Sequence, residues 1–379
     1  EDAEKKNKTI GGYEKLYRIK LEADYLNKIT WEGAQKRYGE NLDKAIDAEN
    51  NPIPPDKVKE RINFELYIMK SMGFPGYFLI VQDYIRGARE ELDIWVGPGR
   101  GSAAGSVVAY CLWITNVDPL RYDLLFERFL NPDRISLPDI DVDFEDCRRG
   151  DVLNWVTERY GYDHVAHIIT YGTMATKSSI KDLCRIQRVP LEKSIELTKY
   201  VPATEFADDV PKNEKGKKPK VNLKNCFKYI NELKEARYGD DINLSQTLSY
   251  AEDLEDTIRQ TGIHACGVII GADELAKFAP MATIKDRVSG NDVIVTQYDG
   301  HYVESVGLIK MDFLGLSTLT LQREALRNIK KRHNIDIDIE AIPIDDELTY
   351  KLFSDGHTVG ICQFESPGMQ KHLKDLKPT

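Results

Sequence analysis

The sequence lacks the features that mark zinc-binding, disulfide-bonded and membrane-spanning proteins. Its 379 residues include six cysteines, which lie far apart and form no Cys-x-x-Cys pair. This spacing excludes a zinc ribbon and argues against a disulfide scaffold, so a reducing compartment such as the cytoplasm fits best. No apolar run approaches the roughly 20 residues that a membrane span needs. The first dozen residues contain neither an initiator Met nor an apolar signal region, and we interpret them as a linker from a longer protein.

Charge is unevenly distributed along the chain. The formal net charge is -10, which argues against a general electrostatic attraction to nucleic acid. Residues 139–146 hold five acidic side chains, whereas residues 211–228 hold seven lysines and a single glutamate. The acidic segment predicts a cation site. The basic segment has little apolar content, so we expect it to contact phosphates rather than to pack as a core.

Apolar periodicity predicts a mixture of helices and strands. Helical patterns cover residues 13–50, 58–69, 76–88, 151–161 and 177–199, and a further one begins at Ser317. Strand-like runs cover residues 264–270, 293–297 and 307–313. Between them, the lysine-rich and proline-punctuated residues 202–222 predict a mobile loop or the edge of a subdomain. The mixture predicts an α+β protein with an inserted helical subdomain.

Residues 138–144 alternate strictly between aspartate and apolar side chains. In an extended backbone Asp139, Asp141 and Asp143 therefore share one face, and the apolar residues share the other. Carboxylates crowded on one face repel one another, and a hard divalent cation with oxygen ligands relieves that repulsion. The alternative is a solvated strand face. A calcium loop fits less well, because the segment lacks the turn glycine and the bidentate glutamate of that motif.

A second segment, residues 307–313, has the same alternation. Lys310 and Asp312 share one face of this predicted strand. Alone, the pattern is a weak signal and is more typical of a buried strand with two edge charges. Beside the first strand, it offers a third carboxylate to a metal pair and an ammonium group to a phosphate. Two cations about 3.5 to 4 Å apart, held by carboxylates, promote in-line displacement at phosphorus.

Residues 97–106 form a glycine-rich segment that precedes an apolar run. Glycine and serine before a helix expose backbone N–H groups to an anion, and Arg100 adds donors for phosphate oxygens. The segment lacks both the ending of a Walker A motif and dinucleotide-binding spacing. A plain structural turn is the alternative. Arg128 follows a short way downstream and offers a further phosphate ligand, or else a surface salt bridge.

Eight long motifs, taken in order, make the sequence similar to a known family. They are GFPGYFLI (73–80), GPGRGSAAGS (97–106), FERFLNP (126–132), PDIDVDF (138–144), IITYGTM (168–174), HACGVII (264–270), KMDFLGL (310–316) and QFESPGM (363–369). With these motifs the sequence resembles the C-family replicative DNA polymerases, the family of bacterial DNA polymerase III α subunits. The resemblance runs through nearly the whole chain.

The resemblance implies an α+β fold, namely a polymerase β-like nucleotidyltransferase palm with an inserted helical thumb. The expected division is a linker at 1–12, the palm at 13–171 and 251–316, the thumb at 172–250 and the start of the fingers at 317–379. The family's N-terminal phosphoesterase-like domain, most of the fingers and the clamp-binding parts have no counterpart in this sequence. We therefore expect a truncated catalytic core.

The resemblance also implies roles for single residues. Asp139, Asp141 and Asp312 match the catalytic aspartates and would bind two Mg²⁺ ions, with Asp143 ranked below them as a ligand. The incoming nucleotide's phosphates would be held by Gly101, Ser102, Arg128 and Lys310. From the basic segment, the candidates for contact with DNA are Lys215, Lys217, Lys218 and Lys220.

The implied function is template-directed DNA synthesis in chromosomal replication, with deoxynucleotides added to a primer 3′-hydroxyl. The expected partners are primer–template DNA and deoxynucleoside triphosphates, together with a sliding clamp and other replisome subunits in the intact protein. No membrane partner is expected. Two alternatives stay open at this point. One is a two-metal nuclease or phosphohydrolase that uses the same carboxylates, and the other is a non-catalytic DNA-holding module.

Overall fold

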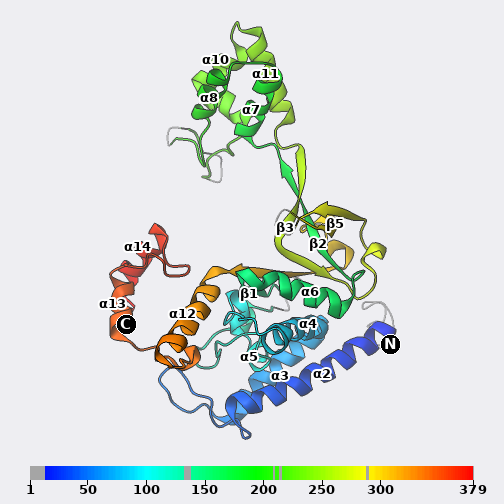
Figure 1. The fold of residues 1–379 in the computed structure, drawn as a ribbon, viewed down its shortest axis with the longest axis vertical. Helices are drawn as coiled ribbons and strands as arrows, with labels where there is room; N and C mark the ends of the chain where they lie inside the picture. The colour runs from blue at the N-terminus through cyan, green and yellow to red at the C-terminus, as the bar shows by residue number, and fades with distance from the viewer. Residues whose placement is uncertain (1–12, 132–137, 208–209, 213–215, 287–289, 379) are drawn as a thin grey trace. The chain divides into compact units, whose positions relative to one another are not determined.

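The computed structural model describes residues 13–131, 138–207, 210–212, 216–286 and 290–378, with the side chains of residues 13–17 excepted. The chain forms two compact units (Figure 1). The first, which we call the discontinuous unit, comprises residues 1–162 and 311–379. The second, the inserted unit, comprises residues 163–310. Within the described residues, no helix has both the length and the apolar character needed to cross a bilayer.

Helices make up most of the discontinuous unit. In chain order they are α2 (Tyr13–Tyr38), α3 (Pro55–Met72), α4 (Pro75–Arg86), α5 (Val107–Cys111), α6 (Arg149–Tyr160), α12 (Ser317–His333), α13 (Glu347–Ser354) and α14 (Pro367–Leu376). The helix predicted over 13–50 ends at Tyr38 because Gly39, with φ +83°, turns the chain there. Proline opens both α3 and α4, where its missing N–H costs no hydrogen bond.

The described residues of this unit include a pair of parallel strands. Strand β1 (Asp141–Glu145) pairs with β6 (Ile309–Leu316), and Asp141 lies opposite Asp312. Strand β1 begins later than the alternation over 138–144 predicts, so Asp139 precedes it. The apolar side chains pack against α4. The rings of Phe144 and Phe313 stack 5.6 Å apart, and Tyr84 of α4 lies 4.7 Å from Phe313.

Among the described residues of the inserted unit, four strands lie side by side in the order β3-β2-β5-β4. Their bounds are β2 (Val165–Thr173), β3 (Ile258–Ile270), β4 (Met281–Lys285) and β5 (Asp292–Asp299). Strand β2 is antiparallel to β3 and parallel to β5, and β4 is antiparallel to β5. The strand predictions over 264–270 and 293–297 fall within β3 and β5. Periodicity does not predict β2 or β4 as strands.

The described residues between β2 and β3 in the chain form a group of helices (Figure 1). They are α7 (Thr176–Ile186), α8 (Leu191–Tyr200), α9 (Leu223–Tyr229), α10 (Asn231–Tyr238) and α11 (Ile242–Leu254). The single helix predicted over 177–199 is wrong, because Arg188 adopts a positive φ and Pro190 starts a new helix. The expectation that 211–228 would not pack is also wrong in part. Leu223, Cys226 and Phe227 of α9 belong to the buried core of this helical part.

Candidate active site

Three aspartates meet at the strand pair of the discontinuous unit. Asp139, Asp141 and Asp312 each place one carboxylate oxygen within 4.8 Å of the others. Asp139 is exposed, Asp141 is half-buried and Asp312 is buried. Carboxylates this close repel one another when ionised, and a cation between them removes that repulsion. Because the donors are all carboxylate oxygens, the set suits a hard divalent ion.

Local backbone geometry fixes the spacing of these aspartates. The parallel register sets Asp141 directly across from Asp312, on strands whose neighbouring side chains are buried. Ahead of β1, the backbone N–H of Ile140 donates to the hydroxyl of Tyr77 at 3.0 Å. Burial raises the pKa of Tyr77, and so do the nearby charges of Asp139, Asp312 and Asp141. The Tyr77 hydroxyl thus lies beside the cluster, a position that no sequence pattern indicates.

Asp143 is set apart from the cluster by its own partner. Its carboxylate lies 3.2 Å from the Nε of Arg100, and its side chain is almost fully buried. Burial raises the pKa of Asp143, whereas Arg100 lowers it. The same contact changes the interpretation of Arg100. The sequence pattern predicts that Arg100 binds phosphate, but in the structure its guanidinium pairs with the Asp143 carboxylate.

The glycine-rich segment lies along β1. The N–H of Gly97 donates to the carbonyl of Asp143 at 2.8 Å, and Val96 bridges to Phe144. Gly99 has φ +102°, and a Cβ there would lie 2.7 Å from the Thr115 side chain, so glycine is required. Residues Gly101–Gly105 then form the 3₁₀ turn η2. The segment therefore joins the strand of aspartates to helix α5.

The helix start that was expected to receive phosphate is already occupied by a side chain of the protein. Glu65 of α3 is completely buried and accepts from the N–H groups of Val107 and Val108, each at 3.0 Å. The prediction that α5 presents its N-terminus to an external anion is wrong for this reason. Sequence reasoning missed Glu65. One signal could have identified it, since Glu65 is a charged residue on the apolar face of α3 that also carries Ile62 and Met69.

The remaining phosphate candidates of the discontinuous unit are exposed. Ser102 lies in η2 and Arg128 in the 3₁₀ turn η3 (Phe126–Arg128), and neither side chain makes a hydrogen bond or ion pair within the described part of the chain. The two turns are in contact, because a Cβ on Gly105 would lie 2.7 Å from the carbonyl of Leu125. Gly101, with φ +64°, exposes its backbone beside Ser102.

Lys310 lies at the beginning of β6, two residues before Asp312. It is partly buried, and its side chain runs past Gly267 of β3, where a Cβ would lie 3.0 Å from its Cε. Glycine at position 267 therefore leaves room for the lysine stem.

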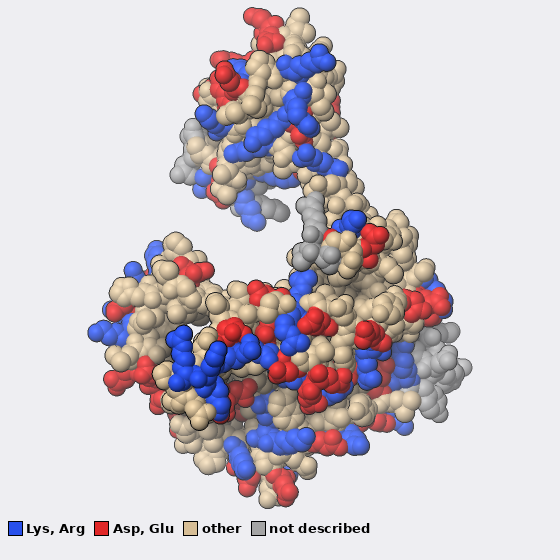
Figure 2. Space-filling model, viewed as in Figure 1, with Lys and Arg blue, Asp and Glu red and all other residues tan. Residues whose placement is uncertain are grey.

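Two of the candidate DNA-binding lysines have acidic partners within the inserted unit. Lys218 lies 3.6 Å from Glu205 and donates to a backbone carbonyl, and Lys220 lies 2.9 Å from Asp256. Lys217 is exposed, and Lys215 lies outside the described residues. Figure 2 shows lysine and arginine side chains on the visible face of the helical part. The basic segment is therefore partly neutralised, which the sequence alone does not indicate.

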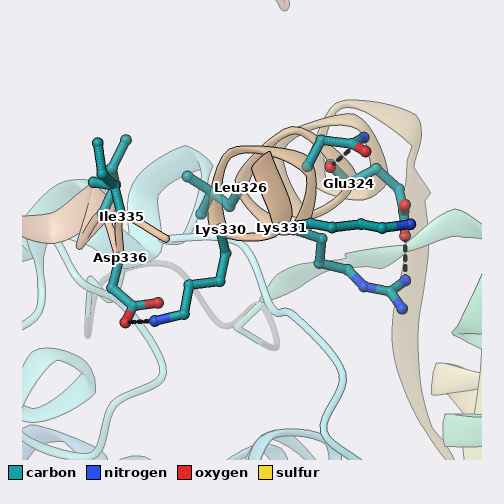
Figure 3. Close-up of a pocket in the computed structure, with 9 residues that line it drawn as sticks. Glu324, Leu326, Lys330, Lys331, Ile335 and Asp336 are labelled. Atoms are coloured by element: carbon teal, nitrogen blue, oxygen red, sulfur yellow. Dashed lines mark hydrogen bonds and ion pairs between the residues drawn. The ribbon is translucent and has the colours of Figure 1, made fainter. Parts of the chain in front are cut away.

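A surface pocket beside α12 contains none of the predicted site residues (Figure 3). Its cationic side chains include Lys330, which is paired with Asp336, and Arg327, which lies 2.6 Å from Glu324. Residues 335–337 also line the pocket. These pairs involve two of the three cationic side chains that line the pocket, the third being Lys331. Because the pocket contains none of the predicted site residues, the aspartate cluster is the stronger candidate site.

Comparison with known proteins places the chain in a family. Residues 24–315 match the model described as the bacterial DNA polymerase III alpha NTPase domain, and residues 318–379 match that of the bacterial DNA polymerase III alpha subunit finger domain. The chain is also similar to curated proteins named DNA polymerase III subunit alpha. It is 40% identical to the protein of Thermus aquaticus over 95% of this chain and 31% of that protein. It is 42% identical to the protein of Neisseria meningitidis serogroup A, over 94% of this chain and 29% of that protein. It is 39% identical to the protein of Bacillus subtilis, again over 94% of this chain and 29% of that protein.

The chain thus spans about three tenths of the length of these relatives. The family model nevertheless covers most of the chain, including both strands of the aspartate cluster and the glycine-rich segment. The resemblance drawn from the sequence motifs is confirmed. This chain belongs to the bacterial DNA polymerase III α subunit family.

Proposed function

We propose that this chain is the catalytic palm of a replicative DNA polymerase, together with its thumb and the start of its fingers. Its reaction is the template-directed addition of deoxynucleotides to the 3′-hydroxyl of a primer. The observation that carries the proposal is the meeting of Asp139, Asp141 and Asp312, within 4.8 Å of one another, in a chain of the polymerase III α family. Helices α7–α11 support the assignment of residues 172–250 to the thumb, between palm segments 13–171 and 251–316.

Asp139, Asp141 and Asp312 would hold two Mg²⁺ ions. Bound there, the ions would supply charge stabilisation for the attacking and leaving oxygens of an in-line displacement. The chain's own contribution is to keep three carboxylates at a fixed spacing despite their repulsion. The β1–β6 register and the Tyr77–Ile140 hydrogen bond do this. In this scheme alignment and charge stabilisation provide most of the rate, and no side chain acts as a tuned general base.

The triphosphate of the incoming nucleotide would lie against the η2 turn. Gly101 offers its backbone, Ser102 its hydroxyl and Arg128 its guanidinium, and all three residues are exposed. Lys310 keeps the phosphate-binding role that the family resemblance implies. Donors that hold a leaving pyrophosphate favour nucleotidyl transfer from a triphosphate over hydrolysis of a phosphodiester by water.

The partners are primer–template DNA and deoxynucleoside triphosphates. Lys215, Lys217, Lys218 and Lys220 are the candidates for the DNA backbone. A sliding clamp and other replisome subunits are proposed to bind segments of the family that this chain does not match. All six cysteines are free thiols, which supports a reducing compartment such as the cytoplasm.

Primer extension tests the proposal. The intact polypeptide and this chain are each incubated with primer–template DNA, the four deoxynucleoside triphosphates and Mg²⁺, and a parallel reaction without nucleotides measures hydrolysis of DNA. Extension that stops when Mg²⁺ is removed supports the proposal. Hydrolysis without extension by the intact polypeptide identifies a two-metal nuclease instead. Metal-independent DNA binding as the sole activity identifies a DNA-holding module.

A further inference from the structure

A fully buried carboxylate, paired with a partly buried arginine, contacts the end of the glycine-rich segment. Arg61 and Glu65 lie one turn apart on α3, and the Arg61 Nε donates to the Glu65 carboxylate at 2.7 Å. That carboxylate also accepts from the Ser106 hydroxyl at 2.7 Å and from the N–H groups of Val107 and Val108. Four donors thus converge on one carboxylate that has no exposure to solvent.

The arginine of this pair connects two turns. Its Nη2 donates to the carbonyl of Gly105 at 2.8 Å and to the carbonyl of Leu124 at 2.9 Å. Gly105 is the last residue of η2, which carries Ser102, and Leu124 shortly precedes η3, which carries Arg128. One guanidinium therefore fixes the distance between the two turns.

A buried carboxylate is a costly way to hold a loop. Removing a carboxylate from water raises the free energy of the folded state, and apolar residues of similar volume would often stabilise a protein as well. Burial accordingly raises the pKa of Glu65, and the hydrogen bonds from Val108 and Arg61 oppose that rise. What the pair provides, and an apolar pair would not, is a defined geometry for Gly105, Ser106 and Leu124.

We propose that Glu65 and Arg61 are positioning residues for the nucleotide site. By joining η2 to η3, they set the separation between the Ser102 hydroxyl and the Arg128 guanidinium, and hence their fit to a triphosphate. Glu65 also fills the N-terminus of α5, so that a phosphate meets η2 and not the helix. This inference rests on the proposed function, since it assigns the exposed groups of both turns to one nucleotide.

Steady-state kinetics of the intact polypeptide test the inference with two variants and one control. Glu65→Gln keeps the size of the side chain, but it places an amide N–H₂ where a carboxylate oxygen accepted hydrogen bonds, so that donors face a donor. Arg61→Lys keeps the charge but cannot reach both carbonyls and the carboxylate. Ile62→Val, which removes one buried methyl group from the same helix, is the control for loss of stability alone. The kcat and the KM for deoxynucleotide are measured for each, with the melting temperature.

We expect the KM for nucleotide to rise about tenfold in Glu65→Gln and in Arg61→Lys, because a displaced turn weakens one charge-assisted contact with the triphosphate. The kcat should change less. Ile62→Val lowers the melting temperature and leaves that KM unchanged. The inference is overturned if the folded Arg61→Lys variant keeps the wild-type KM, whatever happens to Glu65→Gln. It is also overturned if Ile62→Val raises the KM equally. Absence of extension by the wild-type protein would instead refute the proposed function, so the two failures are distinguishable.

Discussion

Asp141 and Asp312 lie opposite each other on neighbouring parallel strands, although they are far apart in the sequence. Parallel pairing in this register brings together two carboxylates that no local pattern connects. Beneath them the rings of Phe144 and Phe313 stack, so the same strand pair is apolar on one side and acidic on the other. The stability of the aromatic layer offsets the repulsion that the carboxylates introduce.

Asp141 and Asp143 lie two residues apart on β1 and should respond differently to replacement by asparagine. Asp141→Asn removes a ligand, so nucleotidyl transfer by the intact polypeptide should fall by about a thousandfold. Because it also removes a like charge, the free energy of unfolding without metal should stay the same or rise. Asp143→Asn leaves Arg100 without its partner, so it should lower that free energy by about 1 to 3 kcal/mol.

Primer extension and thermal unfolding of the two variants provide the measurement. Marked unfolding of Asp141→Asn would show that Asp141 has a structural role. Full activity of Asp141→Asn would remove it from the metal site.

Ser102 and Ser106 offer a second contrast within one segment. Ser102 is exposed, so Ser102→Ala should leave stability unchanged and raise the KM for nucleotide by about tenfold, the value of one charge-assisted contact. Ser106 is buried and accepts from the N–H of Ala109 at 3.1 Å. Ser106→Ala should therefore lower the free energy of unfolding by about 1 to 2 kcal/mol.

Kinetics and chemical denaturation separate the two effects. Lys310→Ala should resemble Ser102→Ala in weakening productive nucleotide binding. If both of these variants bound nucleotide normally, η2 would not be a triphosphate site.

Sequence patterns predict the chemistry of the candidate site better than its geometry. The period-two alternation around Asp141 and Asp312 marks both strands, because one buried face imposes that alternation. The matching alternation of the two segments suggests that the aspartates converge, and the family resemblance implies it, but pairing between distant strands leaves no local signal that fixes the register. The Arg100–Asp143 ion pair escapes prediction for the same reason.

The sequence predicts the mixture of helices and strands, but it predicts the individual helices and strands less well. Strands β3 and β5 have long apolar runs and are found, whereas β2 and β4 are not. Strand β2 ends in a polar, partly exposed segment that pairs with β3, so its strand character depends on that partner. Helix α9 escapes prediction because lysines flank the few apolar residues that it buries.

The basic segment yields a prediction about salt. If Lys217, Lys218 and Lys220 bind the DNA backbone, replacing all three with glutamine should flatten the slope of log K against log salt by about 0.9 for each phosphate that is no longer neutralised. Lys218 and Lys220 have acidic partners, so we expect each of them to account for less than one neutralised phosphate. Binding of duplex DNA at several salt concentrations measures the slope. Lys193→Gln, at a lysine paired with Glu196 on α8, is a control that should not alter it.

An unchanged slope in the triple variant would mean that these lysines do not touch DNA. Binding to the backbone would then have to come from the helices on either side. Lys215, the fourth candidate, can be added to the triple variant to complete the test.

Asp83 gives a prediction about pH. It accepts from Arg86, Arg159 and Tyr160 at 2.9 to 3.1 Å, and so joins α4 to α6. Burial raises the pKa of Asp83, but these hydrogen bonds outweigh it and hold the pKa below its ordinary value. A lowered carboxyl pKa stabilises the fold above the ordinary pKa of about 3.9, and this contribution is lost as the pH falls through the lowered value.

Asp83→Asn should therefore lower the free energy of unfolding by about 1 to 2 kcal/mol at pH 7. The difference from wild type should shrink below about pH 4, where the Asp83 carboxyl takes up a proton in the unfolded chain before it does so in the folded protein. Urea denaturation between about pH 7 and pH 2.5 measures this through the titration range of a carboxyl whose pKa is lowered. Glu90→Gln, at an exposed partner of Arg86, should have little effect at any pH. A difference that stays constant with pH would show that the Asp83 charge does not matter.

Tyr77 and Tyr84 lie on one face of α4, and both are buried, but their hydroxyls differ. The Tyr77 hydroxyl accepts from the N–H of Ile140, between two of the aspartates, at 3.0 Å. The Tyr84 hydroxyl has no hydrogen-bond partner within the described residues. Removing the first should leave a buried N–H unsatisfied, whereas removing the second should relieve the cost of a buried, unpaired hydroxyl.

Tyr77→Phe should accordingly lower the free energy of unfolding by about 1 to 3 kcal/mol, and Tyr84→Phe should leave it unchanged or raise it. Because Ile140 separates Asp139 from Asp141, Tyr77→Phe should also shift the Mg²⁺ dependence of primer extension to higher concentration, by about threefold to tenfold. Tyr84→Phe should keep the wild-type Mg²⁺ dependence and so controls for the loss of a hydroxyl from α4. If Tyr77→Phe is less stable but keeps the wild-type Mg²⁺ midpoint, the hydroxyl supports the backbone and does not position the aspartates.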